Sequence, residues 1–409
     1  MRIAIVGTGI SGLVAAHLLH RDHDLTIFEA SDYVGGHTHT VEVDLNGQRV
    51  AVDTGFIVYN ERNYPNFTRL LAQLGVDTQP STMSFSVKLD NPELEYNGST
   101  FRQLFVQHSN LLRPRFYRML ADIVRFNRSA PAAIANGAAT LTLGDYVGTA
   151  GFSREFIDHY LVPMGAAIWS SPAARVLEMP AGFFIRFFEN HGMLTIDDRP
   201  EWRTIKGGSV RYVEHLTAPF LDRIRLNTPA RHIRRTANHV LVNDERFDEV
   251  VIACHSDQAL DILDDPSDAE REILAALPYQ SNEVVLHTDT SLLPRRRRAW
   301  GAWNYHMSGL PHEPVGVTYN MNVLQSLAVS DTLCVTLNDT ESIAPERIID
   351  RFTYSHPLFT LEGIQAQQRH SEISGQRHTH YCGAYWRNGF HEDGVVSALA
   401  VGRAFGVSL

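Results

Sequence analysis

Three glycines near the start of the chain have the spacing of a loop that binds phosphate groups. Residues 3–6 are apolar and rich in β-branched side chains, which predicts a strand buried on both faces. Gly7, Gly9 and Gly12 follow this strand in the pattern Gly-x-Gly-x-x-Gly. Gly7 permits a tight turn, Gly9 lets the backbone approach a pyrophosphate, and Gly12 lets the next helix pack closely. The N-terminus of that helix would then face the phosphates.

An acidic residue follows the second predicted strand at the distance that a dinucleotide site requires. The stretch 25–30 ends on Glu29 and Ala30, and Glu29 lies about twenty residues beyond the glycines. Its carboxylate would accept hydrogen bonds from ribose hydroxyls and would repel a 2′-phosphate, which disfavours NADP. We therefore predict a dinucleotide site that also includes Ile10 and Ser11. This pattern alone does not choose between NAD and FAD.

A second set of small residues follows the acid. Gly35 and Gly36 are placed to run along the same dinucleotide, and His37 and Thr38 come directly after them. Further along, an acidic residue stands two positions before a glycine, and an aromatic residue follows that glycine. The predicted cofactor contacts in this later stretch are Asp53, Gly55 and Phe56.

A glycine-bracketed polar turn near the C-terminus leads into a helix of small residues. Gly383 would close a strand, and residues 389–405 would form the turn and the helix. A helix that begins there would present its N-terminus to the cofactor and would stabilise negative charge on it. The predicted cofactor contacts at this helix start are Glu392, Asp393, Gly394 and Val395.

Together these stretches resemble the flavin-containing amine oxidase and phytoene desaturase superfamily. Its members carry the Gly-x-Gly-x-x-Gly loop, the acid, a glycine pair followed by a basic residue, and Asp-x-Gly. Residues 206–208, Lys-Gly-Gly, are similar to the family's central glycine pair. The resemblance implies that Ala230 lies at the adenine and that Ala253 ends a buried strand near the cofactor. One departure is His37, which stands where the family has an arginine and is largely neutral at pH 7.

The resemblance implies a bound flavin and an interleaved fold. It implies an α/β protein with a Rossmann-like (GR2-type) FAD-binding domain and an α+β substrate domain of antiparallel sheet plus helices. The FAD would be non-covalent, because the usual context of a covalent cysteine is absent around Cys382. We expect the FAD-binding domain to span residues 1–80, 203–280 and 368–409, and the substrate domain to span residues 81–202 and 281–367.

A narrower resemblance points to lipid chemistry. Residues 35–41, 53–60 and 389–394 are similar to a bacterial subgroup of NAD/FAD-binding proteins. That subgroup resembles the flavin segment fused ahead of plant cyclopropane fatty-acid synthases, and its relatives associate with enzymes that modify double bonds of membrane lipid acyl chains. The resemblance therefore implies a lipid-like substrate and a lipid-modifying partner enzyme. The residue pattern alone does not indicate a lipid.

Aromatic residues and histidines near the flavin motifs are the candidates for catalysis. A flavin accepts a hydride at N5, so the protein must hold the substrate carbon there and can supply a base. Tyr385 and Trp386 follow the strand end and would flank the substrate side of the ring. His391 is either a base or a cap of the helix turn. The catalytic candidates are His391, Tyr385, Trp386 and Tyr319, with Tyr59, Trp169 and Asn320 as further neighbours of the ring.

The resemblance leads us to expect an FAD-dependent oxidoreductase that removes a hydride from a carbon of an apolar, fatty-acyl or other lipid substrate. Three alternatives remain open. The first is a redox-neutral flavin-dependent isomerase that moves a fatty-acid double bond. The second is an amine oxidase, which needs an aromatic cage around N5. The third is a flavin-binding partner of a lipid-modifying enzyme, without turnover of its own.

The composition narrows the other classes of function. The formal net charge of −10 argues against nucleic-acid binding. Cys254, Cys334 and Cys382 lie far apart and form neither a disulfide framework nor a metal site, which fits the cytoplasm. We also expect no targeting segment before the first strand and no membrane-spanning run.

A run of four arginines, Arg295–Arg298, precedes a group of aromatic residues. It indicates either peripheral contact with anionic membrane headgroups or a solvated loop that enters a strand. Residues 110–120 also mix three arginines with apolar residues. They form either a segment on a membrane surface or an ordinary amphipathic helix.

Overall fold

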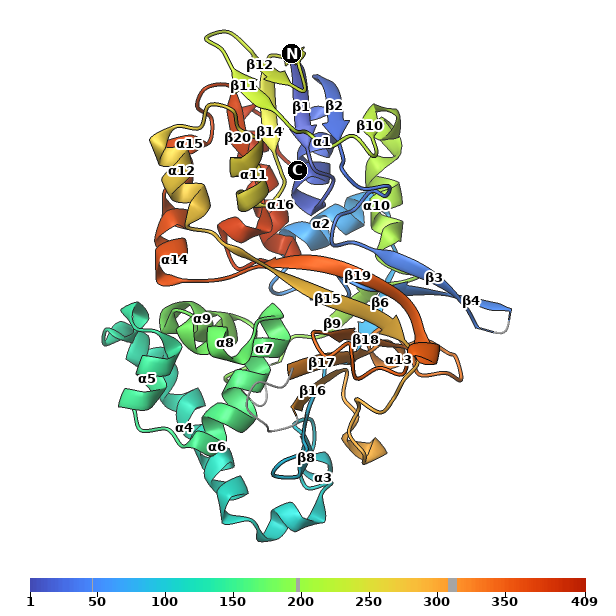
Figure 1. The fold of residues 1–409 in the computed structure, drawn as a ribbon, viewed down its shortest axis with the longest axis vertical. Coiled ribbons are helices and arrows are strands. Elements are labelled where there is room, and N and C mark those ends of the chain that lie inside the picture. Colours follow the sequence, from blue (N-terminus) through green and yellow to red (C-terminus); the bar gives the residue numbers. More distant parts are fainter. Residues whose placement is uncertain (46, 196–198, 308–314) are drawn as a thin grey trace.

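The computed structural model describes residues 1–45, 47–195, 199–307 and 315–409. It has two halves, one above the other in Figure 1. The upper half is built on a parallel sheet, and the lower half combines a larger mixed sheet with a group of helices beside it. The expected combination of a Rossmann-like α/β part and an α+β part is confirmed.

The parallel sheet contains strands from three separate parts of the chain. Its spatial order is β10 (Ile224–Arg225), β2 (Asp24–Phe28), β1 (Arg2–Val6), β14 (Glu249–Ile252) and β20 (Thr379–Tyr381). β1 lies in the middle, which explains why its apolar run is buried on both faces. The chain leaves this half and returns to it twice, as an interleaved fold requires. The domain limits given above stay predictions.

Two layers cover the faces of this sheet. Side chains of β1 alternate between them, so that Ile3 and Ile5 pack into one layer and Ala4 and Val6 into the other. The helices of the first layer are α1 (Ile10–Leu19), α2 (Pro65–Leu74), α10 (Val210–Thr217) and α16 (His391–Ala404). The second layer contains β11 (Ile233–Arg235), β12 (Val240–Val242), β13 (Glu245–Phe247), α11 (Ser256–Ile262), α12 (Asp268–Ala275), α14 (Leu361–Gln368) and α15 (His370–Ile373).

A mixed sheet of seven strands forms the centre of the lower half. Its order is β19 (Ile348–Pro357), β15 (Tyr279–His287), β18 (Cys334–Leu337), β17 (Val315–Asn320), β16 (Trp303–Met307), β7 (Phe85–Leu89) and β8 (Leu94–Asn97). The long strands β15 and β19 run from the upper half into the lower one (Figure 1). β16 and β7 pair in parallel, which corrects the expected antiparallel sheet. The reason is that these two strands belong to different insertions and are joined by a long connection, which permits parallel pairing.

Helices stand beside this sheet, and small strands connect the two halves. The helices are α3 (Phe101–Leu104), α4 (Pro114–Ala135), α5 (Leu143–Thr149), α6 (Arg154–Phe156), α7 (Val162–Trp169), α8 (Ala173–Glu178), α9 (Ala181–Asn190) and α13 (Met321–Leu324). The small strands are the hairpin β3 (Thr40–Leu45) and β4 (Gln48–Asp53), and the trio β5 (Tyr59–Asn60), β9 (Trp202–Ile205) and β6 (Thr78–Ser81). Within the described ranges, no helix has the length and apolar character needed to cross a bilayer.

Helices α1 and α16 are in close contact, which extends from their N-terminal ends to Leu18 and Gly402. A Cβ atom added at Gly394 would lie 2.6 Å from Cγ2 of Ile10 and 2.9 Å from Oγ of Ser11. A Cβ atom at Gly12 would lie 2.0 Å from the carbonyl oxygen of Gly7. Because these glycines have no side chain, the first turns of both helices and the loop after β1 converge on one place.

The crossing predicts that Gly394→Ala destabilises the protein. The added methyl group forces Ile10 or the helix to shift, and overpacking of this kind costs about 1–3 kcal/mol. Gly148→Ala in α5 is the matched control, because a Cβ atom there meets nothing within 4 Å. Thermal unfolding followed by circular dichroism should give a lower midpoint for Gly394→Ala alone. Equal midpoints for the two variants would contradict the role given to Gly394.

Candidate active site

The predicted glycines meet at the converging helix ends. A Cβ atom at Gly9 would meet no atom within 4 Å, whereas a Cβ atom at Gly36 would lie 3.0 Å from Cα of Gly9. The two glycine backbones therefore pack against each other while Gly9 leaves open space on its other side. Ala253 lies under the loop, because its Cβ would be 3.2 Å from a Cβ atom at Gly12. The structure thus brings these predicted residues together, with bare backbone facing the open side.

Glu29 lies at the end of β2 beside this loop, and its carboxylate is held by the loop itself. The backbone N–H groups of Thr8 and Ser31 donate to it, each over 2.8 Å, and the Thr8 hydroxyl donates as well. The Glu29 carbonyl accepts from the N–H of Thr228, which brings the segment with Ala230 alongside. Thr8 was not predicted, although its position between Gly7 and Gly9 marks it as part of the loop.

His37 follows the glycine pair and has a buried polar atom without a partner. Its carbonyl accepts from the N–H of Phe56 over 2.8 Å, and Gly55 packs against the same carbonyl. Nε2 of the ring is buried and bonds to nothing in the described part of the chain. Burial lowers the pKa of His37, so the ring is neutral and offers a hydrogen bond instead of a fixed positive charge.

An orphaned polar atom of this kind marks a place where a ligand atom is expected. Leaving a buried donor or acceptor unpaired costs about 1–3 kcal/mol. The open side of Gly9, the two helix N-termini and the His37 ring together fit a pyrophosphate. Glu29 and Ala230 are placed for the ribose and the adenine. The residues present therefore fit FAD.

His391 lies in the interior and joins three elements. Its Nε2 atom is 3.0 Å from the hydroxyl oxygens of both Thr38 and Tyr212, and its ring stacks on Phe56 with centroids 3.5 Å apart. Burial holds the pKa of His391 well below its ordinary value. This geometry favours the structural alternative for His391, because the nitrogen that would act as a base is already engaged by two hydroxyls.

The two predicted carboxylates of α16 accept hydrogen bonds from backbone N–H groups at the starts of helices. Glu392 accepts from the N–H groups of Asn66 and Phe67, over 3.2 and 2.9 Å, and so caps α2. Asp393 accepts from the N–H of Phe390 over 3.0 Å at the start of its own helix. Burial raises the pKa of Asp393 to about 6. These contacts turn both side chains toward the protein backbone, while Val395 is buried in the core that α1 and α16 share.

Asp53 likewise has protein partners. Its carboxylate accepts from the hydroxyl of Thr40 and from the N–H and hydroxyl of Ser209, and the side chain of Gln325 donates to it over 3.0 Å. Burial raises the pKa of Asp53 to about 6. Asp53 therefore anchors β4 to the loop before α10.

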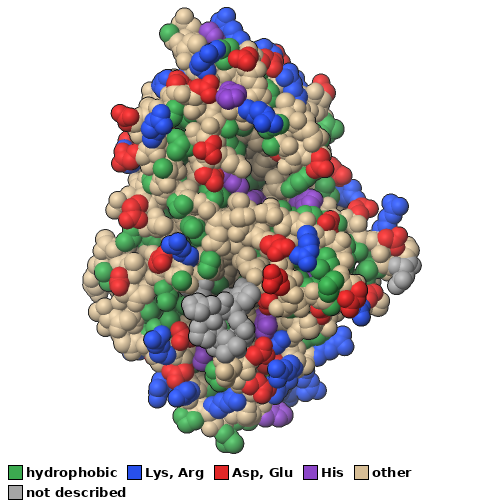
Figure 2. All heavy atoms as spheres, in the orientation of Figure 1, with side chains coloured by type: hydrophobic (Ala, Val, Ile, Leu, Met, Phe, Trp, Pro, Cys, Tyr) green, Lys and Arg blue, Asp and Glu red, His purple; other side chains and the backbone are tan. Residues whose placement is uncertain are grey.

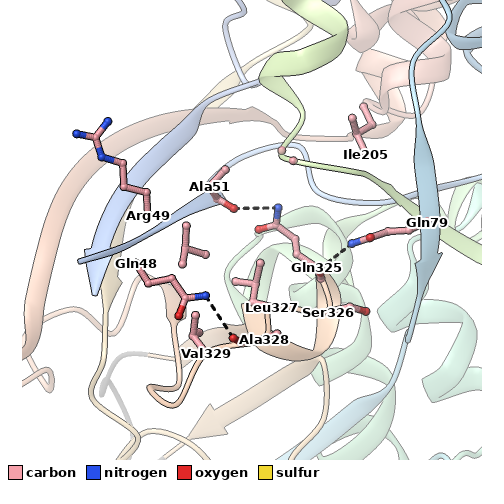
Figure 3. A pocket seen from close by; sticks show the side chains of 13 residues that line it. Gln48, Arg49, Ala51, Gln79, Ile205, Gln325, Ser326, Leu327, Ala328 and Val329 are labelled. Atoms are coloured by element: carbon pink, nitrogen blue, oxygen red, sulfur yellow. Dashed lines mark hydrogen bonds between the residues drawn. The ribbon is translucent and has the colours of Figure 1, made fainter. Parts of the chain in front are cut away.

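Beside Asp53 opens a pocket of about 250 Å³, lined by β4, the glycine pair Gly207-Gly208 and the end of α13 (Figure 3). Its amide side chains bond to carbonyl groups within the pocket wall. Gln325 donates to Ala51 and Gln79 donates to Gln325, over 3.5 and 2.8 Å. Among the described residues that line the pocket, none has a buried side-chain polar atom without a partner.

The four predicted catalytic residues do not form one cluster. Tyr385 and Trp386 lie in the core beside β20, with ring centroids 5.1 Å apart, and the Tyr385 ring covers Gly383. Tyr319 lies in the other half, where its hydroxyl donates to the carbonyl of Ala167 over 3.3 Å. Tyr319 is therefore a residue of the substrate half, separate from the pair at β20.

Five aromatic residues, which we call the aromatic wall, connect the helices of the lower half to the start of α16. In α9, Phe183 stacks on Phe359 with ring centroids 4.5 Å apart. Phe187 of the same helix stacks on Phe390 with centroids 4.9 Å apart. Trp169 lies 4.7 Å from Phe187. A Cβ atom at Gly389 would lie 3.1 Å from the Phe359 ring, so the wall reaches the turn before α16. Of the five, only Trp169 was among the predicted neighbours of the ring.

Three partly buried histidines form a cluster where β15 and β19 leave the upper half. The His37 ring lies 6.0 Å from His255 and 5.2 Å from His356. His255 stacks on Tyr279 at 4.1 Å, and Nδ1 of His356 lies 2.7 Å from the Asn282 amide nitrogen. Burial lowers the pKa of both His255 and His356 to about 3. All three rings are neutral and avoid mutual repulsion.

This cluster predicts a loss of stability in acid. The unfolded chain binds protons at His255 and His356 below pH 6.5, while the folded chain does so only near pH 3. The free energy of unfolding should therefore fall as the pH drops from 6.5 toward 3, by up to about 1.4 kcal/mol per pH unit for each histidine. The double variant His255→Gln/His356→Gln should show a shallower loss in urea unfolding at several pH values. The exposed pair His108→Gln/His232→Gln is the control, and an equal slope in all three proteins would refute this account.

His37 predicts a second measurable effect, on cofactor affinity. His37→Leu removes the polar ring, so FAD should bind about 10- to 100-fold more weakly. His37→Gln keeps a neutral hydrogen-bonding group and should stay within a few-fold of wild type. Titration of the apoprotein with FAD, followed by flavin fluorescence, measures both. If His37→Leu binds FAD as tightly as wild type, the ring does not contact the cofactor.

Comparison with known proteins agrees with the site. The pattern of the family described as flavin containing amine oxidoreductase matches residues 10–308. The chain is 24% identical to amine oxidase (flavin-containing) B of Bos taurus over 265 residues, which is 59% of this chain and 46% of that protein. It is 56% identical to tryptophan 2-monooxygenase of Allorhizobium ampelinum over 41 residues, 10% of this chain and 6% of the other. The chain thus spans less than half the length of these curated relatives.

Solved structures share the fold over the whole chain. A CLA-producing fatty acid isomerase from P. acnes superposes with a TM-score of 0.71 at 18% identity, covering 99% of both chains. Cyclohexylamine oxidase from Brevibacterium oxydans gives 0.67 at 15% identity, again over 99% of both. With the family pattern matched over most of its length, the chain belongs to the flavin-containing amine oxidoreductases, and its cofactor is FAD.

Proposed function

We propose that the protein removes a hydride from a carbon of an apolar, fatty-acyl substrate. FAD, when bound, supplies the hydride acceptor at N5. The observation that carries the proposal is the aromatic wall, which joins the helices of the lower half to the turn before α16. In this proposal the wall, which lies next to the flavin motif, supplies the hydrophobic lining for an acyl chain.

The wall offers a substrate ammonium group only aromatic ring faces and no carboxylate counter-ion. None of its five residues carries a charge. His191, which stacks on Phe187 at 3.8 Å, is neutral because burial lowers its pKa to about 4. A cation brought against this surface would lose its water shell and gain no carboxylate from the wall. An alkyl chain meets no such cost.

Buried hydrogen-bond donors near the wall suit the polar end of an acyl group. Nε1 of Trp169, the hydroxyl of Ser171 and Nε1 of Trp303 are buried and have no partner in the described residues. Trp303 packs edge-on against Tyr319, whose hydroxyl contacts the carbonyl of Ala167 in α7. A carboxyl or ester carbonyl can accept from such donors, so this region would hold the head of the substrate while the chain extends along the wall.

The fold alone does not choose the substrate, because the similar structures include both a fatty acid isomerase and an amine oxidase. The deciding test is anaerobic mixing of the yellow protein with unsaturated or cyclopropane fatty acids, with their phospholipids, and with a primary amine. Loss of the flavin's visible absorption with the lipids alone supports net hydride removal. Unchanged absorption together with a shifted double bond in the product would indicate the isomerase alternative. Bleaching by the amine alone would overturn the proposal.

The buried N–H donors predict a variant that weakens substrate binding and leaves FAD binding unchanged. Trp169→Phe removes the N–H group and keeps an aromatic, though smaller, ring, so KM for the acyl substrate should rise about 5- to 30-fold while FAD content stays the same. Trp300→Phe is the control, because its N–H donates to the Pro294 carbonyl over 2.7 Å, away from the wall. Steady-state rates with detergent-dispersed substrate measure both, and an equal KM in the two variants would refute the donor role.

A further inference from the structure

Four exposed apolar side chains gather at the lower end of the molecule. Leu112 is 88% exposed and Phe101 is 74% exposed, the two highest values among the large hydrophobic residues described. Leu111 and Tyr117 are each 46% exposed. These four residues, which we call the apolar tip, lie on α3, the 3-10 turn η1 (His108–Leu112) and the start of α4.

Contacts show that the apolar tip is one continuous surface. The Phe101 ring lies 4.9 Å from Phe105, and Phe105 lies 6.0 Å from Tyr117. The Tyr117 hydroxyl donates to the carbonyl of Leu111 over 3.0 Å. Burial of such an apolar surface away from water is energetically favourable, so its exposure indicates an interaction site.

The chain around the apolar tip is basic although the whole protein is acidic. Residues 96–121 contain four arginines and no Asp or Glu, and residues 290–305 do the same, against a formal net charge of −10 for the chain. The second segment includes the 3-10 turn η5 (Arg297–Ala299), which contacts α3. Figure 2 shows Lys and Arg side chains gathered with hydrophobic ones at this end.

The structure also shows which arginines are available to a partner. Arg295 pairs with Asp90, and Arg296 pairs with Glu93 and Glu95. Two of the four arginines in the run are therefore already neutralised within the protein. Arg102, Arg297 and Arg298 have no acidic partner among the described residues and are exposed. Arg115 and Arg118 are 83% and 63% exposed and lie 3.6 and 3.8 Å from Glu155. The available positive charge therefore surrounds the apolar tip.

We propose that this end of the molecule docks on the surface of an anionic lipid bilayer. The apolar tip would enter the boundary between headgroups and acyl chains, and the arginines would contact lipid phosphates. A second copy of the chain is the weaker fit, because a two-fold contact at this end would bring one set of arginines against another. The inference does not depend on the substrate proposed above, although it places a source of acyl chains at one end of the substrate half.

Vesicle sedimentation of the full-length, FAD-containing protein tests the docking surface. Wild type should bind vesicles of phosphatidylglycerol and phosphatidylcholine in equal parts, and added salt should weaken this binding. Vesicles of phosphatidylcholine alone should bind it far less. Arg102→Glu/Arg297→Glu/Arg298→Glu should reduce binding about 100-fold or more. Phe101→Asp/Leu112→Asp should reduce it comparably, because both changes take charge into the interface.

Arg234→Glu/Arg246→Glu is the matched control. These exposed arginines flank Leu241 on the small sheet β11–β13, at the opposite end of the molecule (Figure 1). The control should bind as wild type does, and FAD content and thermal midpoint verify that each variant is folded. Absence of binding to anionic vesicles, or equal loss in the control, would overturn the proposal. Self-association that Phe101→Asp/Leu112→Asp abolishes would assign the surface to a second copy instead. Neither result would touch the substrate test, which uses detergent-dispersed acyl chains.

Discussion

The close crossing of α1 and α16 is the constraint on which the upper half depends. It brings the first described helix and the last one to the same place, start against start, and the glycines at positions 394 and 402 permit the contact. Each helix start has N–H groups without intrahelical partners and a partial positive charge. One site for an anionic cofactor is therefore assembled from both ends of the sequence. The chain between them is free to build a second half over it.

Buried polar groups then fix the surroundings of the crossing. His391 connects Thr38 and Tyr212 through one ring nitrogen, and Glu392 closes the start of α2. Because an uncharged imidazole needs no counter-ion, several of them can be buried together near β15 and β19. The strands that carry His356 and Tyr279 continue into the lower half. The cofactor site and the substrate half are thus linked by shared strands, which limits how far one can move against the other.

Local patterns in the sequence predicted the glycine loop and the helix start of the cofactor site. Contacts between distant parts of the chain could not be predicted in this way. The glycine loop, Glu29 and the start of α16 are each defined by spacing within a few dozen residues, and the structure brings them together. The aromatic wall joins α9, the end of β19 and the start of α16, and no local pattern links Phe187 to Phe390. The pairing of Arg296 with Glu93 and Glu95 depends on where β8 lies in the sheet. The sequence therefore could not show which arginines of the run are paired and which are free. For the same reason the helix-capping contacts of Glu392 and Asp393 could not be predicted, and their place at the cofactor stays a prediction.

The central claim is that the crossing of α1 and α16 holds one FAD per chain. The most direct measurement is the visible spectrum and flavin-to-protein ratio of the purified protein, before and after incubation with FAD. The account predicts a yellow protein that reaches one non-covalent flavin per chain and releases it on denaturation. A folded, colourless protein that cannot be loaded with FAD would contradict it.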